Sequence, residues 1–340
     1  MKIVPEFCHD FLRDGCVQKL SYQENVDFNK WKNQIKDKFC QLIGIEKLKE
    51  NQCSLNFEIE KEVQKDGYKQ IRFTIESERG CIVPVYILIP DTNKDKYPVA
   101  ITLQGHSTGF HNSIGEPKNE KEEEYALGRG QFAVQAVKRG YIAVAIEQRA
   151  MGERRPLEHL RNMSQMCMYE AMTAIMMGRT LIAERVWDVS RVIDALSNFN
   201  QCDLDDIFIT GNSGGGTASY YAACLDERIK LSVPSCAICT YKGSIMNIFH
   251  CACNYIPDAF NWFEMADLSC MIAPRKLLVV SGKHDVIFPI EETRKAFDTI
   301  KNIYDKADCL SNCEMIETEK DHYWCEDIVW NGIKKIRNEK

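Results

Sequence analysis

The spacing of apolar residues changes along the chain and divides it into three stretches. Within the first 50 residues, apolar side chains recur at intervals of three and four: Phe28, Trp31, Ile35, Phe39 and Leu42. This spacing places them on one face of a helix. We therefore expect residues 1–50 to form a helical extension that packs on the body of the protein.

The second stretch alternates apolar and polar residues, as half-buried strands do. Two such runs, at residues 57–59 and 71–75, flank Asp66-Gly67, which is a hairpin turn signal. The next apolar run, CIVPVYILIP, contains Pro84. Because proline cannot donate a ladder hydrogen bond, this run is predicted to be an edge strand. The front of the sheet is therefore expected to be antiparallel.

In the third stretch, apolar strand patterns alternate with helical patterns. The strand patterns are YPVAITLQG, YIAVAIEQR, IFITG, IKLSVPSCA, RKLLVVSG and CEMIE. Strands that are apolar on both faces and alternate with helices are typical of a parallel sheet covered on both sides. We predict one α/β domain over residues 51–340, with about eight strands, mostly parallel but antiparallel at the N-terminal edge.

Two long connections interrupt this alternation. Residues 106–130 are polar, and their Lys-Glu run is interpreted as a solvated face. Residues 241–273 form a long, cap-like excursion between two core strands. Long loops at the carboxyl ends of strands in an open α/β sheet tend to build the ligand crevice.

The strand IFITG runs directly into Gly-Asn-Ser-Gly-Gly at residues 211–215, and a helix is expected next. This fits the G-x-S-x-G turn, in which flanking glycines let strand and helix approach closely and the serine is lifted clear of the sheet. We predict that Ser213 is a nucleophile and that the Gly214 N–H faces a developing oxyanion. The alternative is a glycine-rich turn whose serine caps a helix; the flanking strand and helix favour the nucleophile.

A serine hydroxyl needs a base, and the base needs an orienting acid. After a G-x-S-x-G turn, the acid is expected next in the chain and the histidine last. Asp285 follows the strand before the last predicted strand, and His322 lies between the last predicted strand and the last helix. His322 is the predicted base and Asp285 the predicted acid, although His322 as a surface histidine stays open. Glu317 and Glu319 are weaker alternatives for the acid.

The second oxyanion donor is expected in the loop Gln104-Gly105-His106, where the His106 N–H would face the developing charge. Whether the side chains of His106, His250 and Asn212 contact substrate stays open. For Arg149 an ion pair that holds a loop is favoured over substrate contact.

Composition narrows the class of partner. The chain has 340 residues and a formal net charge of −6, which argues against nucleic acid or an anionic membrane as the main partner. No apolar run approaches the ~20 residues needed to span a bilayer, and the first residues lack the apolar core of a signal peptide. The sixteen cysteines are interpreted as reduced thiols of a cytoplasmic protein.

One group of cysteines is a candidate for metal binding. Cys236 and Cys239 form C-x-x-C, and Cys251 and Cys253 form C-x-C, a pattern that could ligate zinc. The first pair, however, lies in a predicted core strand and its exit. Packing or pocket lining is therefore favoured over a metal site.

The ordered motifs Gly-Asn-Ser-Gly-Gly, Gly-Lys-His-Asp and Asp-His resemble those of α/β-hydrolases over residues 57–340. Within that superfamily the chain resembles acetyl xylan esterase and cephalosporin-C deacetylase-like enzymes, which are related to dienelactone hydrolases. The stretches RTLIAERVWDVSRVIDAL, HCACNYIPDAF and EMADLSCMIAPRKLLVVSGKHDVIFPI carry this resemblance. It implies a triad of Ser213, Asp285 and His322, with backbone donors at Gly214 and His106.

The chain departs from this resemblance at two places. Gln104-Gly105 stands where His-Gly is frequent, and Glu147-Gln148-Arg149-Ala150 stands where Asp-x-Arg-Gly is frequent. We expect both changes to affect which substrate is bound more than the type of reaction.

The expected function is a serine carboxylester hydrolase, acting as an acetyl esterase on a small or oligosaccharide ester without a metal or organic cofactor. One alternative is a prolyl-oligopeptidase-like serine peptidase, which the lack of a propeller-sized N-terminal region disfavours. The other is a non-catalytic binding protein with a relic triad. The acyl group, the alcohol and the oligomeric state stay open.

Overall fold

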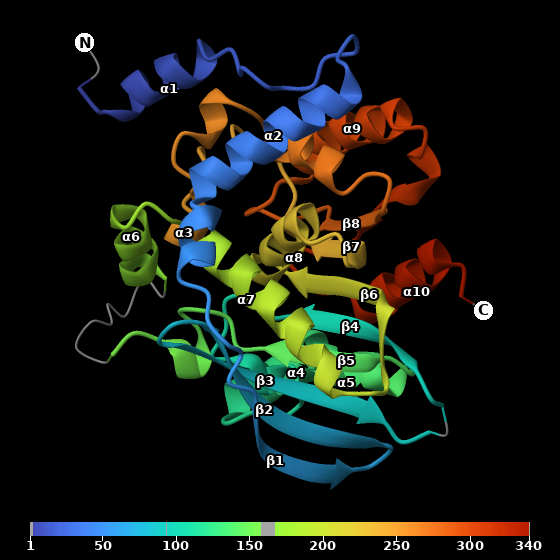
Figure 1. The fold of residues 1–340 in the computed structure, drawn as a ribbon. Coiled ribbons are helices and arrows are strands. Elements are labelled where there is room, and N and C mark those ends of the chain that lie inside the picture. The colour runs from blue at the N-terminus through green and yellow to red at the C-terminus, as the bar shows by residue number, and fades with distance from the viewer. Residues whose placement is uncertain (1–2, 93, 158–166, 340) are drawn as a thin grey trace.

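The computed structural model describes residues 3–92, 94–157 and 167–339. Nine strands within these residues form one twisted sheet (Figure 1), in the order β1-β2-β3-β5-β4-β6-β7-β8-β9. They are β1 (Glu58–Lys65), β2 (Tyr68–Glu78), β3 (Cys81–Pro90), β4 (Tyr97–Leu103), β5 (Ile142–Ile146), β6 (Cys202–Asn212), β7 (Ile229–Ser235), β8 (Lys276–Gly282) and β9 (Cys313–Thr318).

The direction of the strands follows the predicted pattern. The pairs β1-β2, β2-β3 and β3-β5 are antiparallel, and every other neighbouring pair is parallel. The β1-β2 hairpin turns at Asp66-Gly67, where Gly67 has a φ of 80°. The α/β-hydrolase fold with an antiparallel front is therefore confirmed, with nine strands rather than about eight.

The prediction that Pro84 marks an edge strand is wrong, because β3 lies between β2 and β5. The proline is tolerated because pairing with β5 begins one residue later, at Val85. The Pro84 carbonyl accepts a hydrogen bond from the Glu147 N–H just beyond β5. Pro84 therefore lies where the β3-β5 ladder ends, and a proline is tolerated at such a position.

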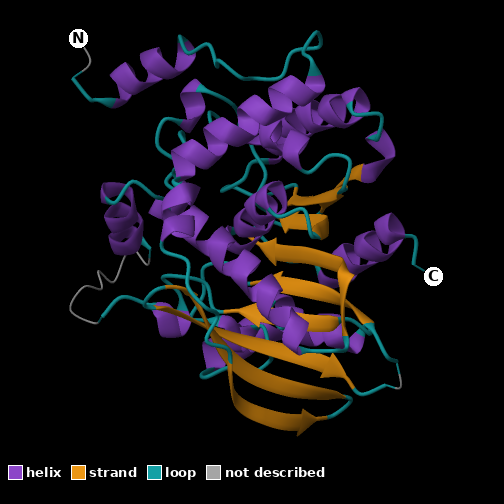
Figure 2. Cartoon of the chain, viewed as in Figure 1, coloured by secondary structure: helices purple, strands orange, loops and turns teal. Residues whose placement is uncertain are grey.

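Helices cover both faces of the sheet, as Figure 2 shows. They are α1 (Glu6–Asp14), α2 (Phe28–Ile43), α3 (Ile45–Glu50), α4 (Glu120–Arg129), α5 (Phe132–Lys138), α6 (Met168–Met176), α7 (Leu181–Ala195), α8 (Gly214–Leu225), α9 (Ile290–Lys306) and α10 (Glu326–Arg337). Short 3₁₀ turns, including η5 (Ala252–Asn254) and η7 (Met265–Met271), occupy the 241–273 excursion.

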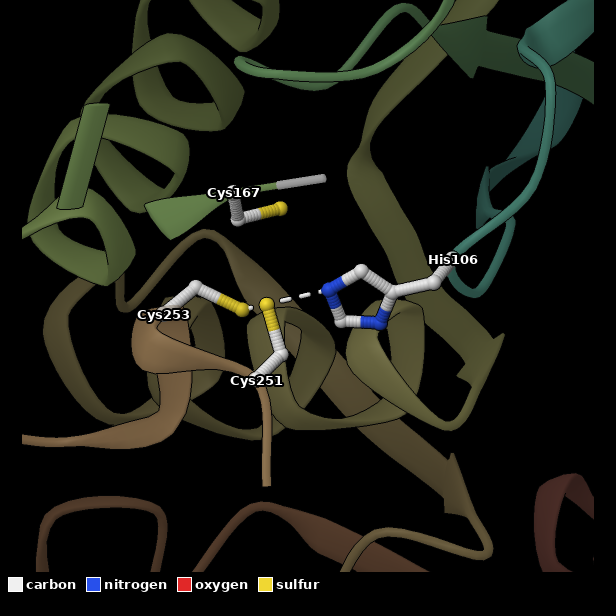
Figure 3. A group of neighbouring side chains, drawn as sticks. All are labelled: His106, Cys167, Cys251 and Cys253. Carbon is white, nitrogen blue, oxygen red and sulfur yellow. Dashed lines mark hydrogen bonds between the residues drawn. The ribbon is translucent and has the colours of Figure 1, made fainter. Parts of the chain in front are cut away.

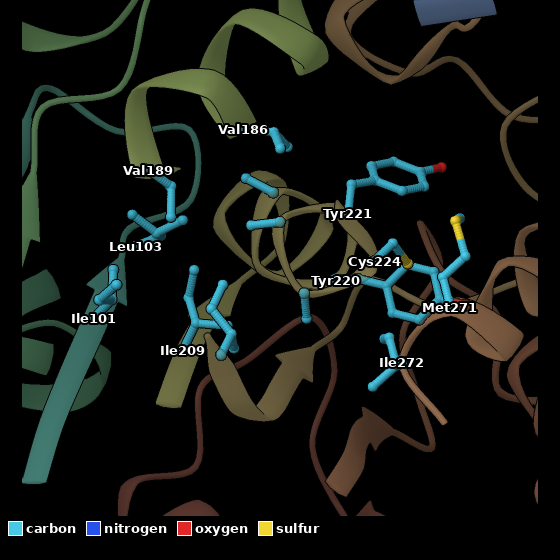
Figure 4. Close-up of a cluster of buried hydrophobic side chains, with 14 of the residues drawn as sticks. Ile101, Leu103, Val186, Val189, Ile209, Tyr220, Tyr221, Cys224, Met271 and Ile272 are labelled. Carbon is cyan, nitrogen blue, oxygen red and sulfur yellow. The ribbon is translucent and has the colours of Figure 1, made fainter. Parts of the chain in front are cut away.

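Alternate residues of the central strands enter two separate cores. On β6, Ile207 and Ile209 join the core under α2, α7, α8 and α9, whereas Phe208 joins the core under α5 and α10. Figure 4 shows the first core around α8, where Ile209 and Tyr220 pack among other buried side chains. Strand β6 is therefore held on both faces, which fixes the position of the turn at its end.

The predicted N-terminal helix is present as α2. Asp27 caps its N-terminus, with its carboxylate accepting from the Lys30 N–H at 3.1 Å, and Gly44, whose φ is 75°, caps its C-terminus. Trp31, Ile35 and Phe39 are buried in the core shared with α8, while Phe28 and Leu42 are partly buried against it. The apolar face is confirmed, and the division of the chain at residue 50 stays a prediction.

The Lys-Glu run is not wholly a solvated face. In α4, Glu122 is only 7% exposed. Its carboxylate lies 3.0 Å from His111 Nε2 and accepts from the Lys118 N–H at 2.7 Å and from the Thr108 hydroxyl. The interpretation failed because one acid of a charged run can be buried when donors surround it.

None of the helices in the described residues is both long enough and apolar enough to cross a membrane.

Candidate active site

Ser213 lies at the turn between β6 and α8. Its φ of 57° and ψ of −125° are unfavourable for a residue with a Cβ. The turn is held by two backbone hydrogen bonds, from the Ser213 N–H to the Ser235 carbonyl and from the Thr217 N–H to the Ser213 carbonyl, both 2.8 Å. Such a strained, braced backbone is typical of functional sites.

The glycines on either side of Ser213 make this turn possible. A Cβ on Gly211 would lie 2.4 Å from the Leu103 carbonyl oxygen, and one on Gly215 would lie 2.1 Å from the same atom. Both distances are far shorter than a van der Waals contact, and the obstacle is backbone. The predicted reason for these glycines, close approach of strand and helix, is confirmed.

Asp285 and His322 meet beside this turn. His322 Nδ1 lies 2.8 Å from Asp285 Oδ2, and Asp285 Oδ1 accepts from the N–H groups of Ile287 and Phe288 at 2.8 and 2.9 Å. The Asp285 carboxylate is fully buried, and the Phe288 ring stacks on the His322 ring at 5.8 Å. The acid is therefore fixed by two amides, and the imidazole is fixed by the acid and by a ring.

One cavity of about 370 Å³ brings the predicted residues together. Among the residues that line it are Ser213, His322, Gly105, His106, Asn212 and Phe249. Residues 249–251 and 254 come from the predicted excursion and form one of its walls. The excursion therefore shapes the pocket, as its position in the chain predicted.

The 104–106 loop lies directly against Ser213. A Cβ on Gly105 would lie 2.9 Å from the Asn212 carbonyl oxygen and 3.2 Å from Ser213 Cβ. The His106 ring packs on Gly214, where a Cβ would lie 2.8 Å from His106 Cε1. This contact places the backbone of both predicted oxyanion donors next to Ser213, and their role stays a prediction.

The polar residues left open by the sequence have distinct positions. Asn212 braces the turn, since its Oδ1 accepts from the Ser235 hydroxyl at 2.9 Å, and it also lines the cavity. His250 lines the cavity too; its Nε2 lies 2.9 Å from the Ser244 hydroxyl, and burial lowers its pKa. Both side chains are therefore held by hydrogen bonds to other residues of the chain, and they would contact a bound substrate from these fixed positions.

Arg149 holds loops together instead of lining the cavity. Its guanidinium pairs with Asp188, Glu78 and Glu184, and all four side chains are buried. The favoured ion-pair interpretation of Arg149 is therefore confirmed.

Glu147, at one of the departures from the family pattern, ties the loop after β4 to the loop after β5. Its carboxylate accepts from the Gln104 amide at 3.2 Å and from the N–H groups of Phe110 and Glu153 at 3.2 and 3.3 Å. It is 1% exposed, and burial raises its pKa to about 7 although the backbone N–H groups of Glu153 and Phe110 oppose the shift.

This raised pKa gives a testable pH dependence. The folded protein keeps a proton on Glu147 that the unfolded chain loses, so the associated stability is present below the ordinary pKa of 4.5 and is lost as the pH rises through about 7. We expect the free energy of unfolding of wild type to fall by about 3 kcal/mol relative to Glu147→Gln between pH 4.5 and 8. Urea unfolding at several pH values measures this difference. Exposed Glu319→Gln is the control, and parallel curves for wild type and Glu147→Gln would contradict the assignment.

The four cysteines singled out in the sequence do not form one group. Cys236 lies beside the Asp285-His322 pair, and burial raises its pKa to about 12. Cys239 is buried in the core. Cys251 and Cys253 instead meet His106 and Cys167 (Figure 3). The sequence offered no signal for Cys167, because it is distant in the chain from every other member of this group.

Comparison with known proteins identifies the family and the fold. A model of the Abhydrolase family matches residues 10–323. "Putative hydrolase YtaP" of Bacillus subtilis is 25% identical over 66% of this chain and 74% of its own length.

Among the solved structures that share the fold, two have names that describe acetyl xylan esterases. One is described as a "putative acetyl xylan esterase" from Bacteroides fragilis, with a TM-score of 0.76 and 17% identity, covering 99% of this chain and 96% of its own. Acetyl xylan esterase 1 from a Thermoanaerobacterium species has a TM-score of 0.61 and 15% identity, covering 97% and 98%. With the family model matching most of its length, the chain belongs to the Abhydrolase family of α/β-hydrolases.

Proposed function

We propose that this protein is a serine esterase that uses Ser213, His322 and Asp285. The observation that carries the proposal is the shared cavity, where the strained serine turn and a histidine bonded to a buried carboxylate lie together. This is the arrangement that acyl transfer through a serine requires. The names of the structural relatives point in the same direction.

The reaction follows from the tautomer of His322. Because Nδ1 donates to Asp285, Nε2 is left as the base that takes the Ser213 proton as the oxygen attacks the ester carbonyl. The tetrahedral oxyanion is stabilised by the N–H groups of Gly214 and His106. His322 then protonates the leaving alcohol and activates the water that releases the acid from the acyl-enzyme.

The proposed substrate is an acetyl ester of a small alcohol or short oligosaccharide. A cavity of about 370 Å³ lies at the small end of the usual range for ligand sites, which suits a short acyl group and a compact alcohol. A cytoplasmic location is proposed as well, because none of the sixteen cysteines forms a disulfide, as expected in a reducing compartment.

The test compares ester with amide hydrolysis. We expect kcat/KM for p-nitrophenyl acetate and acetylated xylo-oligosaccharides to exceed that for aminoacyl-p-nitroanilides by about 10³ or more. Faster cleavage of the anilides would favour the peptidase alternative. Hydrolysis of neither class would overturn the esterase proposal.

A further inference from the structure

A buried group of one imidazole and three thiols lies beside the proposed active site. The donor atoms of His106, Cys167, Cys251 and Cys253 all lie within 4.8 Å of one another. His106 Nε2 and Cys253 Sγ are 3.2 Å apart. Figure 3 shows the three sulfur atoms and one ring nitrogen directed into a single space.

The four residues come from three separate parts of the fold. His106 belongs to the loop after β4, Cys167 immediately precedes α6, and Cys251 and Cys253 flank the start of η5. The tertiary structure therefore brings the four side chains together. They lie where the 104–106 loop, the start of α6 and the 249–254 wall of the cavity meet.

We propose that His106, Cys167, Cys251 and Cys253 bind a structural zinc ion. Three cysteines and one histidine are a common ligand set for structural Zn²⁺, which is four-coordinate and tetrahedral. Zn–S bonds of about 2.3 Å place sulfur atoms about 3.8 Å apart around the ion. Donor atoms within 4.8 Å of one another need only small side-chain adjustments to reach that geometry.

A buried arginine beside the group supports a charged metal–thiolate site. Arg185 on α7 is 1% exposed, and its Nη2 lies 3.1 Å from Cys167 Sγ. Its other hydrogen bonds go to the Arg149 carbonyl, and Nη1 is a buried donor without a hydrogen-bond partner. Among the residues that the structure describes, no carboxylate forms an ion pair with Arg185.

The charges explain why this arginine is placed there. Zn²⁺ with three thiolates and a neutral imidazole carries a net charge of −1, which one guanidinium balances. With three neutral thiols, the guanidinium would be buried without an anion, which is costly. A disulfide would use two of the thiols and leave the imidazole and Arg185 without a role.

The site has a consequence for the active site that rests on the proposed function. Zinc would hold the His106 ring on Gly214 and hold the excursion near Cys251 in place. Both proposed oxyanion donors would then be positioned by a metal that takes no part in the chemistry. We expect loss of the ion to lower kcat and leave Ser213 reactive toward a fluorophosphonate.

The test is the zinc content of the untagged 340-residue chain purified under reducing conditions from zinc-supplemented cells. We expect about one zinc per chain in wild type, and X-ray absorption showing three sulfur ligands at about 2.3 Å and one nitrogen at about 2.0 Å. Cys167→Ser, Cys251→Ser and Cys253→Ser should each reduce the content at least fivefold. Cys224→Ser, a buried thiol outside the group, should keep it.

The site would be overturned by less than about 0.2 zinc per wild-type chain, by another metal in its place, or by a disulfide among the three cysteines. Retention of full zinc by all three serine variants would do so as well. The wild-type spectrum decides the matter even if a variant misfolds. None of these measurements depends on esterase activity, so failure of the zinc site and failure of the proposed function can be told apart.

Discussion

Ser213→Ala is expected to lower kcat for p-nitrophenyl acetate by about 10⁶-fold, down to the residual rate that oxyanion stabilisation and binding alone provide. The reason is that the substitution removes only the hydroxyl group, which is the proposed nucleophile. Alanine retains the Cβ that already occupies the strained backbone position, with φ at 57°. The melting temperature should therefore change little, and the loss should appear in kcat.

Stopped assays with the purified variant measure this loss, with wild type taken through the same purification as the reference. Ser219→Ala on α8 is a matched control. The Ser219 hydroxyl donates a 2.7 Å hydrogen bond to the Gly215 carbonyl, and Ser219 is not among the residues that line the cavity. A Ser213→Ala protein with wild-type kcat would remove Ser213 from the mechanism.

Asp285→Asn is expected to lower kcat by about 10⁴-fold while the protein stays folded. Its Oδ1 can still accept from the N–H groups of Ile287 and Phe288, so the amide NH₂ is turned toward His322. His322 Nδ1 must then accept a hydrogen bond, which places the proton on Nε2. The imidazole is thereby held in the tautomer that cannot deprotonate Ser213.

Asp321→Asn is the matched control, because Asp321 precedes His322 in the chain but its side chain is exposed. We expect its kcat to stay within about threefold of wild type. The pH dependence of kcat/KM, measured for all three proteins, separates loss of the base from general damage to the site. A large effect of Asp321→Asn together with a small effect of Asp285→Asn would reassign the acid.

The serine turn was predictable because its causes are local. Gly211, Ser213 and Gly215 are adjacent in the chain, and the requirement for close backbone approach can be deduced from their spacing. Asp285 and His322 followed from the order of strands, since each lies in a loop at the carboxyl end of a core strand. The structure shows the hydrogen bond between Asp285 and His322. The catalytic roles of the two residues are proposals.

Other features depended on partners that the sequence does not place. The proline at position 84 predicts an edge strand, but β3 pairs with β5 only from Val85 onward. The sequence does not show which strand lies beside β3 or where that pairing begins. The Lys-Glu run predicts an exposed Glu122, but Thr108 and His111 bind its carboxylate in the fold. No regular spacing in the sequence links these two residues to Glu122.

The cysteines illustrate the same limit most clearly. Spacing grouped Cys251 and Cys253 with Cys236 and Cys239, whereas the fold groups them with His106 and Cys167. A ligand set drawn from three distant segments has no signature in one sequence.

The central claim is that Ser213 is an activated nucleophile, and covalent labelling tests it most directly. Wild-type protein is treated with a fluorophosphonate, and the adduct is located by intact mass and peptide mapping. We predict one adduct per chain, on Ser213, with labelling slowed at least about 100-fold in His322→Ala. An adduct on another residue, or no adduct on a protein that hydrolyses acetyl esters, would contradict the account.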